Sequence, residues 1–131
     1  MCIRDSHEGA LVDWLHEAGR AQAQGAAIGV VFNAGAYTHT SVALHDAIKG
    51  AGVRLIELHI SNVHAREAFR HHSYISPVAS AVMAGFGVGG YALAIDGLVM
   101  QHRASEGVVR DGRALEAPAA SEGVARLPSK D

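Results

Sequence analysis

Six consecutive residues without a polar side chain, Ala27–Phe32, are followed at once by Asn33, and this pattern allows few folds. The run reads Ala-Ile-Gly-Val-Val-Phe. A short, continuously apolar run is typical of a strand buried on both faces, as the strands of parallel sheets are. The preceding segment, 7–24, spaces Leu11 and Leu15 four residues apart with acidic residues between them, which predicts an amphipathic helix.

The rest of the chain continues this alternation of helices and strands. Helices are predicted at 40–49 and 91–102, strands at 54–60 and 78–83, and one or two helical turns at 64–70. Such alternation indicates an α/β architecture with a parallel sheet. The length of 131 residues suits a single domain.

Composition excludes several classes of partner. Hydrophobic residues make up 49% of the chain, which is enough for a core, and the net charge is −2. No positive field is expected to attract nucleic acid or an anionic membrane, so neither is predicted as a partner. Cys2 is the single cysteine and cannot form an internal disulfide, and the start lacks the apolar run of a signal peptide. A cytoplasmic location is therefore expected.

Two segments need separate interpretation. Residues 78–95 carry no charge over 18 positions, but four glycines interrupt the run. Each glycine costs a helix about 1 kcal/mol relative to alanine, so a strand, a glycine turn and a helix are favoured over a membrane span. Residues 104–131 contain no Phe, Trp or Tyr and include two prolines, so we expect a disordered tail there.

Polar residues at the ends of the first two predicted strands are the candidates for chemistry, because ligands bind outside the carboxyl ends of parallel strands. Asn33 and His39 follow the first strand and flank Gly35, where a backbone without a Cβ can approach a ligand. The alternative, which composition alone favours, is an ordinary strand-to-helix loop with a capping Thr or Ser.

Glu57 and His59 lie two positions apart on the second predicted strand, so their side chains share one face. A carboxylate can then hold one imidazole nitrogen while the other faces a substrate, which is the arrangement of a general acid. A structural Glu–His pair remains the alternative. Arg66 and Arg70, four residues apart, can share a helical face and bind a carboxylate or hydroxyls, or they can simply be solvated.

Neither a metal nor a nucleotide cofactor is predicted. Several histidines occur between residues 39 and 72, but no HxxxH or HExxH spacing is present. Residues 85–90 match GxGxxG formally, yet no further βα unit follows them as a dinucleotide fold requires. The glycines are therefore interpreted as a tight turn.

Several long motifs of the chain closely resemble type II 3-dehydroquinate dehydratase. They are His-Glu-Gly-Ala-Leu-Val-Asp-Trp at 7–14, Asn-Ala-Gly-Ala-Tyr-Thr-His-Thr-Ser-Val-Ala-Leu at 33–44, Glu-Leu-His-Ile-Ser-Asn-Val-His-Ala-Arg-Glu at 57–67, Phe-Arg-His at 69–71, and the glycine turn before Tyr91. The resemblance runs in order over 7–103, which would be a partial dehydroquinase domain preceded by a non-family segment, 1–6. It implies a flavodoxin-like, three-layer parallel sheet that lacks the family's N-terminal strand-helix-strand.

The resemblance also implies a reaction without a cofactor. Family members remove water from 3-dehydroquinate by reversible anti elimination through an enolate, in the shikimate pathway of aromatic amino acid biosynthesis or in quinate metabolism, and they assemble as dodecamers. By motif, His59 would donate the proton and Glu57 would orient it. The substrate would be bound by the side chains of Asn33, His39 and Arg70, by the backbone amides of Ile60 and Ser61, and by Asp46 from a neighbouring subunit, with Gly35 and Arg66 in support.

The family's catalytic base has no counterpart in these motifs. Family members carry a tyrosine base and an essential lid arginine ahead of the stretch that corresponds to His7, and Arg66 would lie near that base. Tyr37, Tyr74 and Tyr91 occupy other motif positions. Two interpretations stay open: a dehydratase represented by an N-terminally truncated chain that is weak or inactive, or a remnant that only binds a cyclic hydroxy acid or assists assembly.

Overall fold

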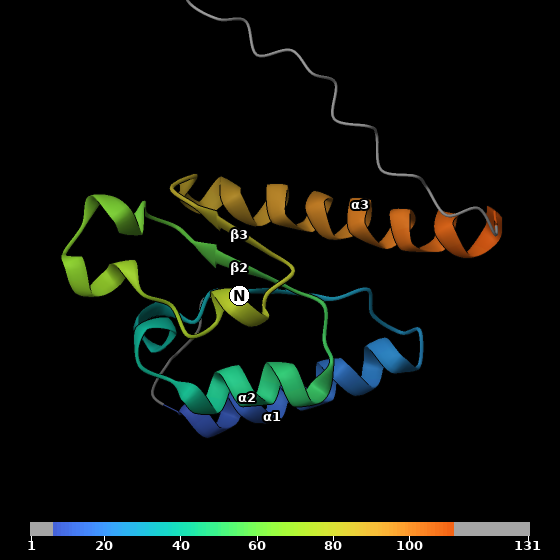
Figure 1. Ribbon diagram of the computed structural model, residues 1–131, viewed down its shortest axis with the longest axis horizontal. Helices are drawn as coiled ribbons and strands as arrows, with labels where there is room; N and C mark the ends of the chain where they lie inside the picture. Colours follow the sequence, from blue (N-terminus) through green and yellow to red (C-terminus); the bar gives the residue numbers. More distant parts are fainter. Residues whose placement is uncertain (1–6, 112–131) are drawn as a thin grey trace, which may run out of the picture.

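The computed structural model describes residues 7–111, which form three layers around a parallel sheet (Figure 1). Helices α1 (Glu8–Ala23) and α2 (Val42–Ala51) cover one face of the sheet, and α3 (Gly90–Asp111) covers the other. The strands are β1 (Val30–Phe32), β2 (Leu55–His59) and β3 (Ala81–Ala84). The predicted α/β architecture is confirmed.

The strands pair in parallel and in chain order, β1-β2-β3. Val31 is opposite Ile56, and Glu57 is opposite Val82. Because all three strands run the same way, their carboxyl ends meet at one edge of the sheet. The turns that follow them, including residues 63–71, extend beyond that edge on the left of Figure 1.

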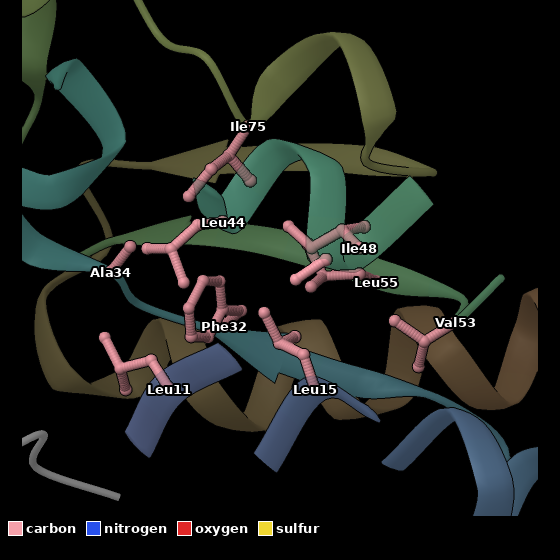
Figure 2. Packing of buried hydrophobic residues seen from close by; sticks show 10 residues of the cluster. Leu11, Leu15, Phe32, Ala34, Leu44, Ile48, Val53, Leu55 and Ile75 are labelled. Atoms are coloured by element: carbon pink, nitrogen blue, oxygen red, sulfur yellow. The ribbon is translucent and has the colours of Figure 1, made fainter. Parts of the chain in front are cut away.

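Two apolar clusters hold the layers together. On the α1 and α2 face, leucines of both helices pack on the first two strands, as Figure 2 shows for Leu11, Leu15, Leu44, Phe32 and Leu55. On the opposite face, a smaller cluster joins Ile56 of β2 to Ala94 and Leu98 of α3. Each fully buried leucine contributes roughly 1.5–3 kcal/mol, so the contacts of the helices with the strands supply much of the stabilisation.

Three predicted boundaries are corrected. β1 begins at Val30 rather than residue 27, because Gly29 has φ +151° and interrupts the extended backbone. The predicted third strand is shifted, since Ser76–Val78 forms a 3-10 turn containing Pro77 and β3 begins at Ala81. The predicted helical turns are confirmed at Val63–Ala65 and Ala68–His71.

The third correction concerns the C-terminal helix, which extends to Asp111 and so includes eight residues assigned to the predicted tail. The Arg54 side chain donates to Ser105 Oγ at 3.2 Å, and His102 lies 3.5 Å from Glu106 one turn on. These contacts extend the helix past the point where apolar periodicity fades. The remainder of that tail, 112–131, and the segment 1–6 lie outside the described residues.

The glycine-rich segment between β3 and α3 is a turn, as predicted. Gly85 and Gly87 have φ +89° and +59°, a backbone conformation that favours glycine. A Cβ on Gly90 would lie 3.0 Å from Leu58 Cδ1, so glycine lets the start of α3 approach β2 closely. None of the helices within residues 7–111 is long and apolar enough to cross a membrane.

Substitution of Gly19 by alanine should lower the free energy of unfolding by about 1–3 kcal/mol. A Cβ there would lie 2.7 Å from the Ala51 carbonyl oxygen and 2.8 Å from its Cβ, so α1 and α2 would have to separate. Gly9→Ala is the matched control on the same helix, because nothing lies within 4 Å of its added Cβ. Urea unfolding measures the free energy of unfolding of both variants. Equal changes in the two variants would contradict close packing at Gly19.

Candidate active site

The loop after β1 brings an amide and an imidazole to the carboxyl edge of the sheet. Asn33 follows the last residue of β1, and Gly35–His39 forms a 3-10 turn. The Gly35 backbone N–H donates to Asn33 Oδ1 at 3.1 Å, and φ of Gly35 is +58°. His39 Nδ1 lies 2.7 Å from the carbonyl oxygen of His72, and because a carbonyl only accepts, Nδ1 donates and Nε2 is left for a ligand.

The last residues of β2 form the Glu57–His59 pair that the strand spacing predicts. His59 Nε2 donates to Glu57 Oε1 at 2.8 Å. Glu57 is 0% exposed and His59 7% exposed, so the pair is shielded from water. Since Nε2 is used by Glu57, Nδ1 is the nitrogen of His59 that remains for chemistry.

The carboxylate of Glu57 receives three further hydrogen bonds from hydroxyl groups. Ser73 Oγ donates to Oε1 at 2.8 Å, Thr38 Oγ1 also donates to Oε1, and Ser76 Oγ donates to Oε2. Burial by itself would raise the pKa of Glu57, but the hydrogen bonds from His59 and the three hydroxyls outweigh it and lower the pKa to about 2. Glu57 is therefore a fixed negative charge beside the imidazole.

A cleft of about 190 Å³ lies at this edge of the sheet. It is lined by Asn33, Gly35, Ala36, His39, His59, Ile60, Ser61, Val63, Arg66 and Arg70. The rings of His39 and His59 stack within 12° of parallel, with centroids 6.3 Å apart. Two imidazoles and two guanidinium groups thus meet in one small space, which favours a ligand that carries a carboxylate and hydroxyls.

Arg70 enters the cleft wall from the 3-10 turn Ala68–His71. Its Nε donates to Glu67 Oε2 at 2.7 Å, while Arg66 Nε is 3.7 Å from the same oxygen. Glu67 thus holds both arginines on one side of the cleft. Because Arg70 uses Nε for Glu67, its terminal guanidinium nitrogens can donate to a ligand in the cleft that Arg70 lines.

Most, but not all, of the predicted site residues come together. Glu57 does not line the cleft but contacts His59, which does. This is the arrangement expected of a group that orients His59. Asp46 is exposed on α2 and is not among the residues that line the cleft. Within the described part of the chain, no group of three or more His, Cys, Asp or Glu residues has an arrangement that could hold a metal ion.

Sequence reasoning missed four hydroxyl groups of the site. Thr38, Ser73 and Ser76 surround Glu57, and the hydroxyl of Tyr91 accepts from Asn33 Nδ2 at 3.1 Å. Hydroxyl residues are common in loops, and their spacing along the chain carries no signal for a shared acceptor. Tyr91 follows the glycine turn that resembles the family, but the sequence does not show that the packing of α3 places Tyr91 beside Asn33 at the end of β1.

The pKa of Glu57 predicts an acid-labile contribution to stability. Its folded value of about 2 is below the ordinary 4.5, so the contribution is present above pH 4.5 and is lost as the pH falls from 4.5 toward 2. The shift corresponds to about 3 kcal/mol. Glu57→Gln should flatten the dependence of unfolding free energy on pH in this range, measured by urea unfolding. Glu17→Gln, an exposed control on α1, should retain this pH dependence, and the reverse result would contradict the assignment.

Comparisons with known proteins agree with this geometry. The sequence profile of the family described as dehydroquinase class II matches residues 1–99. The 3-dehydroquinate dehydratase of Acidovorax sp. (strain JS42) is 73% identical over 95 residues, which are 72% of this chain and 64% of that protein. The 3-dehydroquinate dehydratase 2 of Ralstonia nicotianae (strain ATCC BAA-1114 / GMI1000) is 68% identical over 99 residues, which are 76% of this chain and 64% of the relative.

Solved structures show the same relationship. The type II dehydroquinase from Butyrivibrio crossotus DSM 2876 superposes with a TM-score of 0.64 at 46% identity, covering 71% of this chain and 62% of that one. The chain therefore spans a little under two thirds of the length of these relatives. The family profile matches most residues of the chain, and the fold is shared with a solved member. The chain therefore belongs to the class II dehydroquinase family.

Proposed function

We propose that this chain supplies the proton donor and most of the substrate-binding groups of a 3-dehydroquinate dehydratase. The reaction is the reversible anti elimination of water from 3-dehydroquinate to 3-dehydroshikimate through an enolate, in the shikimate or quinate pathway. The observation that carries this proposal is the buried Glu57–His59 pair at the wall of a cleft lined by Asn33, His39 and Arg70.

His59 acts as the general acid on the leaving hydroxyl. Its Nε2–H is held by Glu57, so the proton that moves is on Nδ1, and the imidazolium carries both protons. Glu57 remains ionised because its pKa is about 2, and its negative charge stabilises the imidazolium in a place that water barely reaches. Glu57 thus orients and balances His59 without exchanging a proton itself.

The substrate lies along the carboxyl ends of β1 and β2. Asn33, His39 and Arg70 bind its hydroxyl groups, and the backbone amides of Ile60 and Ser61 bind its carboxylate. Support for this arrangement comes from the cleft, which all five residues line.

Two further residues have roles that depend on groups outside the described cleft. Asp46, exposed on α2, reaches a neighbouring subunit in a dodecamer of the family type, and Arg66 favours the ionised form of a tyrosine base. Tyr37, Tyr74 and Tyr91 match other motif positions, so none of them is that base. The matched motifs also contain no counterpart of the lid arginine. We therefore expect the 131-residue chain to bind substrate but to turn it over slowly.

Titration of the chain with 3-dehydroquinate, followed by NMR or calorimetry, tests the proposal. Arg70→Ala should weaken binding by about ten-fold or more, because a charged hydrogen bond to the ligand is lost. Arg103→Ala, which changes an exposed arginine on α3, should leave the affinity unchanged. Absence of binding at millimolar concentration, or equal losses in both variants, would contradict the assigned cleft. Binding without turnover even after the tyrosine-bearing segment of the family is joined to the chain would favour a role limited to binding or assembly.

A further inference from the structure

The side chain of Asn33 is held at both ends by groups of the protein. Its Oδ1 accepts from the backbone N–H of Gly35 at 3.1 Å, and its Nδ2 donates to the hydroxyl of Tyr91 at 3.1 Å. A backbone N–H can only donate, so the oxygen of the amide must face Gly35 and the nitrogen must face Tyr91. The orientation of the amide is therefore determined by its surroundings.

Tyr91 reaches Asn33 because of how α3 begins. Gly90 is buried with its Cα close enough to β2 that an added Cβ would lie 3.0 Å from Leu58 Cδ1. This close approach places the first turn of α3 beside the carboxyl end of β1, 58 positions earlier in the chain. Asn33 lines the cleft and Tyr91 does not, so Asn33 is the group through which Tyr91 can act on a ligand there.

We propose that Tyr91 is a positioning residue that, together with the Gly35 amide, fixes Asn33 as a hydrogen-bond donor to the ligand. One Nδ2 hydrogen is given to Tyr91, so the second Nδ2 hydrogen remains to donate into the cleft, while Oδ1 is turned toward Gly35 and keeps only one lone pair. A fixed N–H selects an acceptor, such as the oxygen of a substrate hydroxyl or of an enolate. This inference rests on the proposed function for the identity of the ligand, but the hydrogen bond exists without it.

The first test uses the full chain without ligand. In a ¹⁵N spectrum, the side-chain amide signal of Asn33 is identified by its loss in Asn33→Ala. Tyr91→Phe removes only the hydroxyl, and should shift this signal and speed the exchange of its protons with water. Tyr74→Phe is the matched control, since it also removes one phenolic hydroxyl, from a half-exposed ring that packs edge-on against His72. An Asn33 signal unchanged by Tyr91→Phe would overturn the proposal.

The second test measures the affinity for 3-dehydroquinate in a double-mutant cycle. Tyr91→Phe alone should weaken binding about three- to ten-fold, the usual range for one hydrogen bond. In the Asn33→Ala background the same substitution should have no further effect, because Tyr91 acts through Asn33. Additive losses would overturn the positioning role. A chain that binds no 3-dehydroquinate at all would overturn the ligand assignment and the proposed function, while the amide signal still decides the Tyr91–Asn33 bond.

Discussion

Replacement of His59 by alanine should lower kcat by about 10²–10⁴-fold once the chain is joined to the segment that carries the family's tyrosine base and lid arginine ahead of residue 7. The leaving hydroxyl would then depart without a positioned acid. Turnover is followed by the absorbance of the conjugated product. We expect the unmodified 131-residue chain to stay near the detection limit, since the proposed function assigns it an acid but no base for the proton abstraction.

The pattern among variants separates the roles of the two histidines of the cleft. His39→Ala should raise KM more than it lowers kcat, because its free Nε2 serves binding rather than proton transfer. Glu57→Gln should retain some activity but lower kcat, since the neutral amide no longer balances the imidazolium. Full activity of the His59→Ala enzyme would remove His59 from the role of acid and make His39 the candidate. Turnover typical of an intact enzyme by the unmodified chain would mean that one of its own residues replaces the tyrosine.

We expect the chain to associate with copies of itself through the edge of β1, and replacement of Trp14 by lysine to weaken this association by about ten-fold or more. β1 is an edge strand of the described sheet, paired with β2 alone. Beside it lies a cavity of about 430 Å³ with a mainly apolar lining that includes Leu11, Trp14 and Phe32. An uncovered apolar edge favours association between copies, and Trp14 is a large part of that surface. Sedimentation velocity over a concentration series measures the effect.

Leu93→Lys is the control for this prediction. Leu93 is 46% exposed, as Trp14 is, but it belongs to α3 on the other side of the sheet. The charge added is the same, so a difference between the variants reports the location of the contact rather than solubility. If Leu93→Lys dissociated the chain and Trp14→Lys did not, association would occur through α3 and the edge of β1 would be excluded.

The local pattern of the chain was enough to predict its layers. The apolar run before Asn33 and the alternation of helices and strands led to a parallel sheet, which the pairing of Val31 with Ile56 and of Glu57 with Val82 confirms. Periodicity works here because buried strands need apolar residues and covering helices need one apolar face. Periodicity did not give the ends of the elements correctly. The helix α3 extends to Asp111 because the long-range contact of Ser105 with Arg54 outweighs a weak local pattern.

What the sequence alone determined about the site is the set of groups attached to each strand end: the two-residue spacing of Glu57 and His59, and the residues that follow Phe32. Only the tertiary structure decided what surrounds them. The hydroxyls of Thr38, Ser73 and Ser76 converge on Glu57 from separate loops, and Tyr91 reaches Asn33 from α3. The physical reason is that a hydrogen bond depends on separation in space, whereas spacing along the chain limits that separation only within a helix or strand.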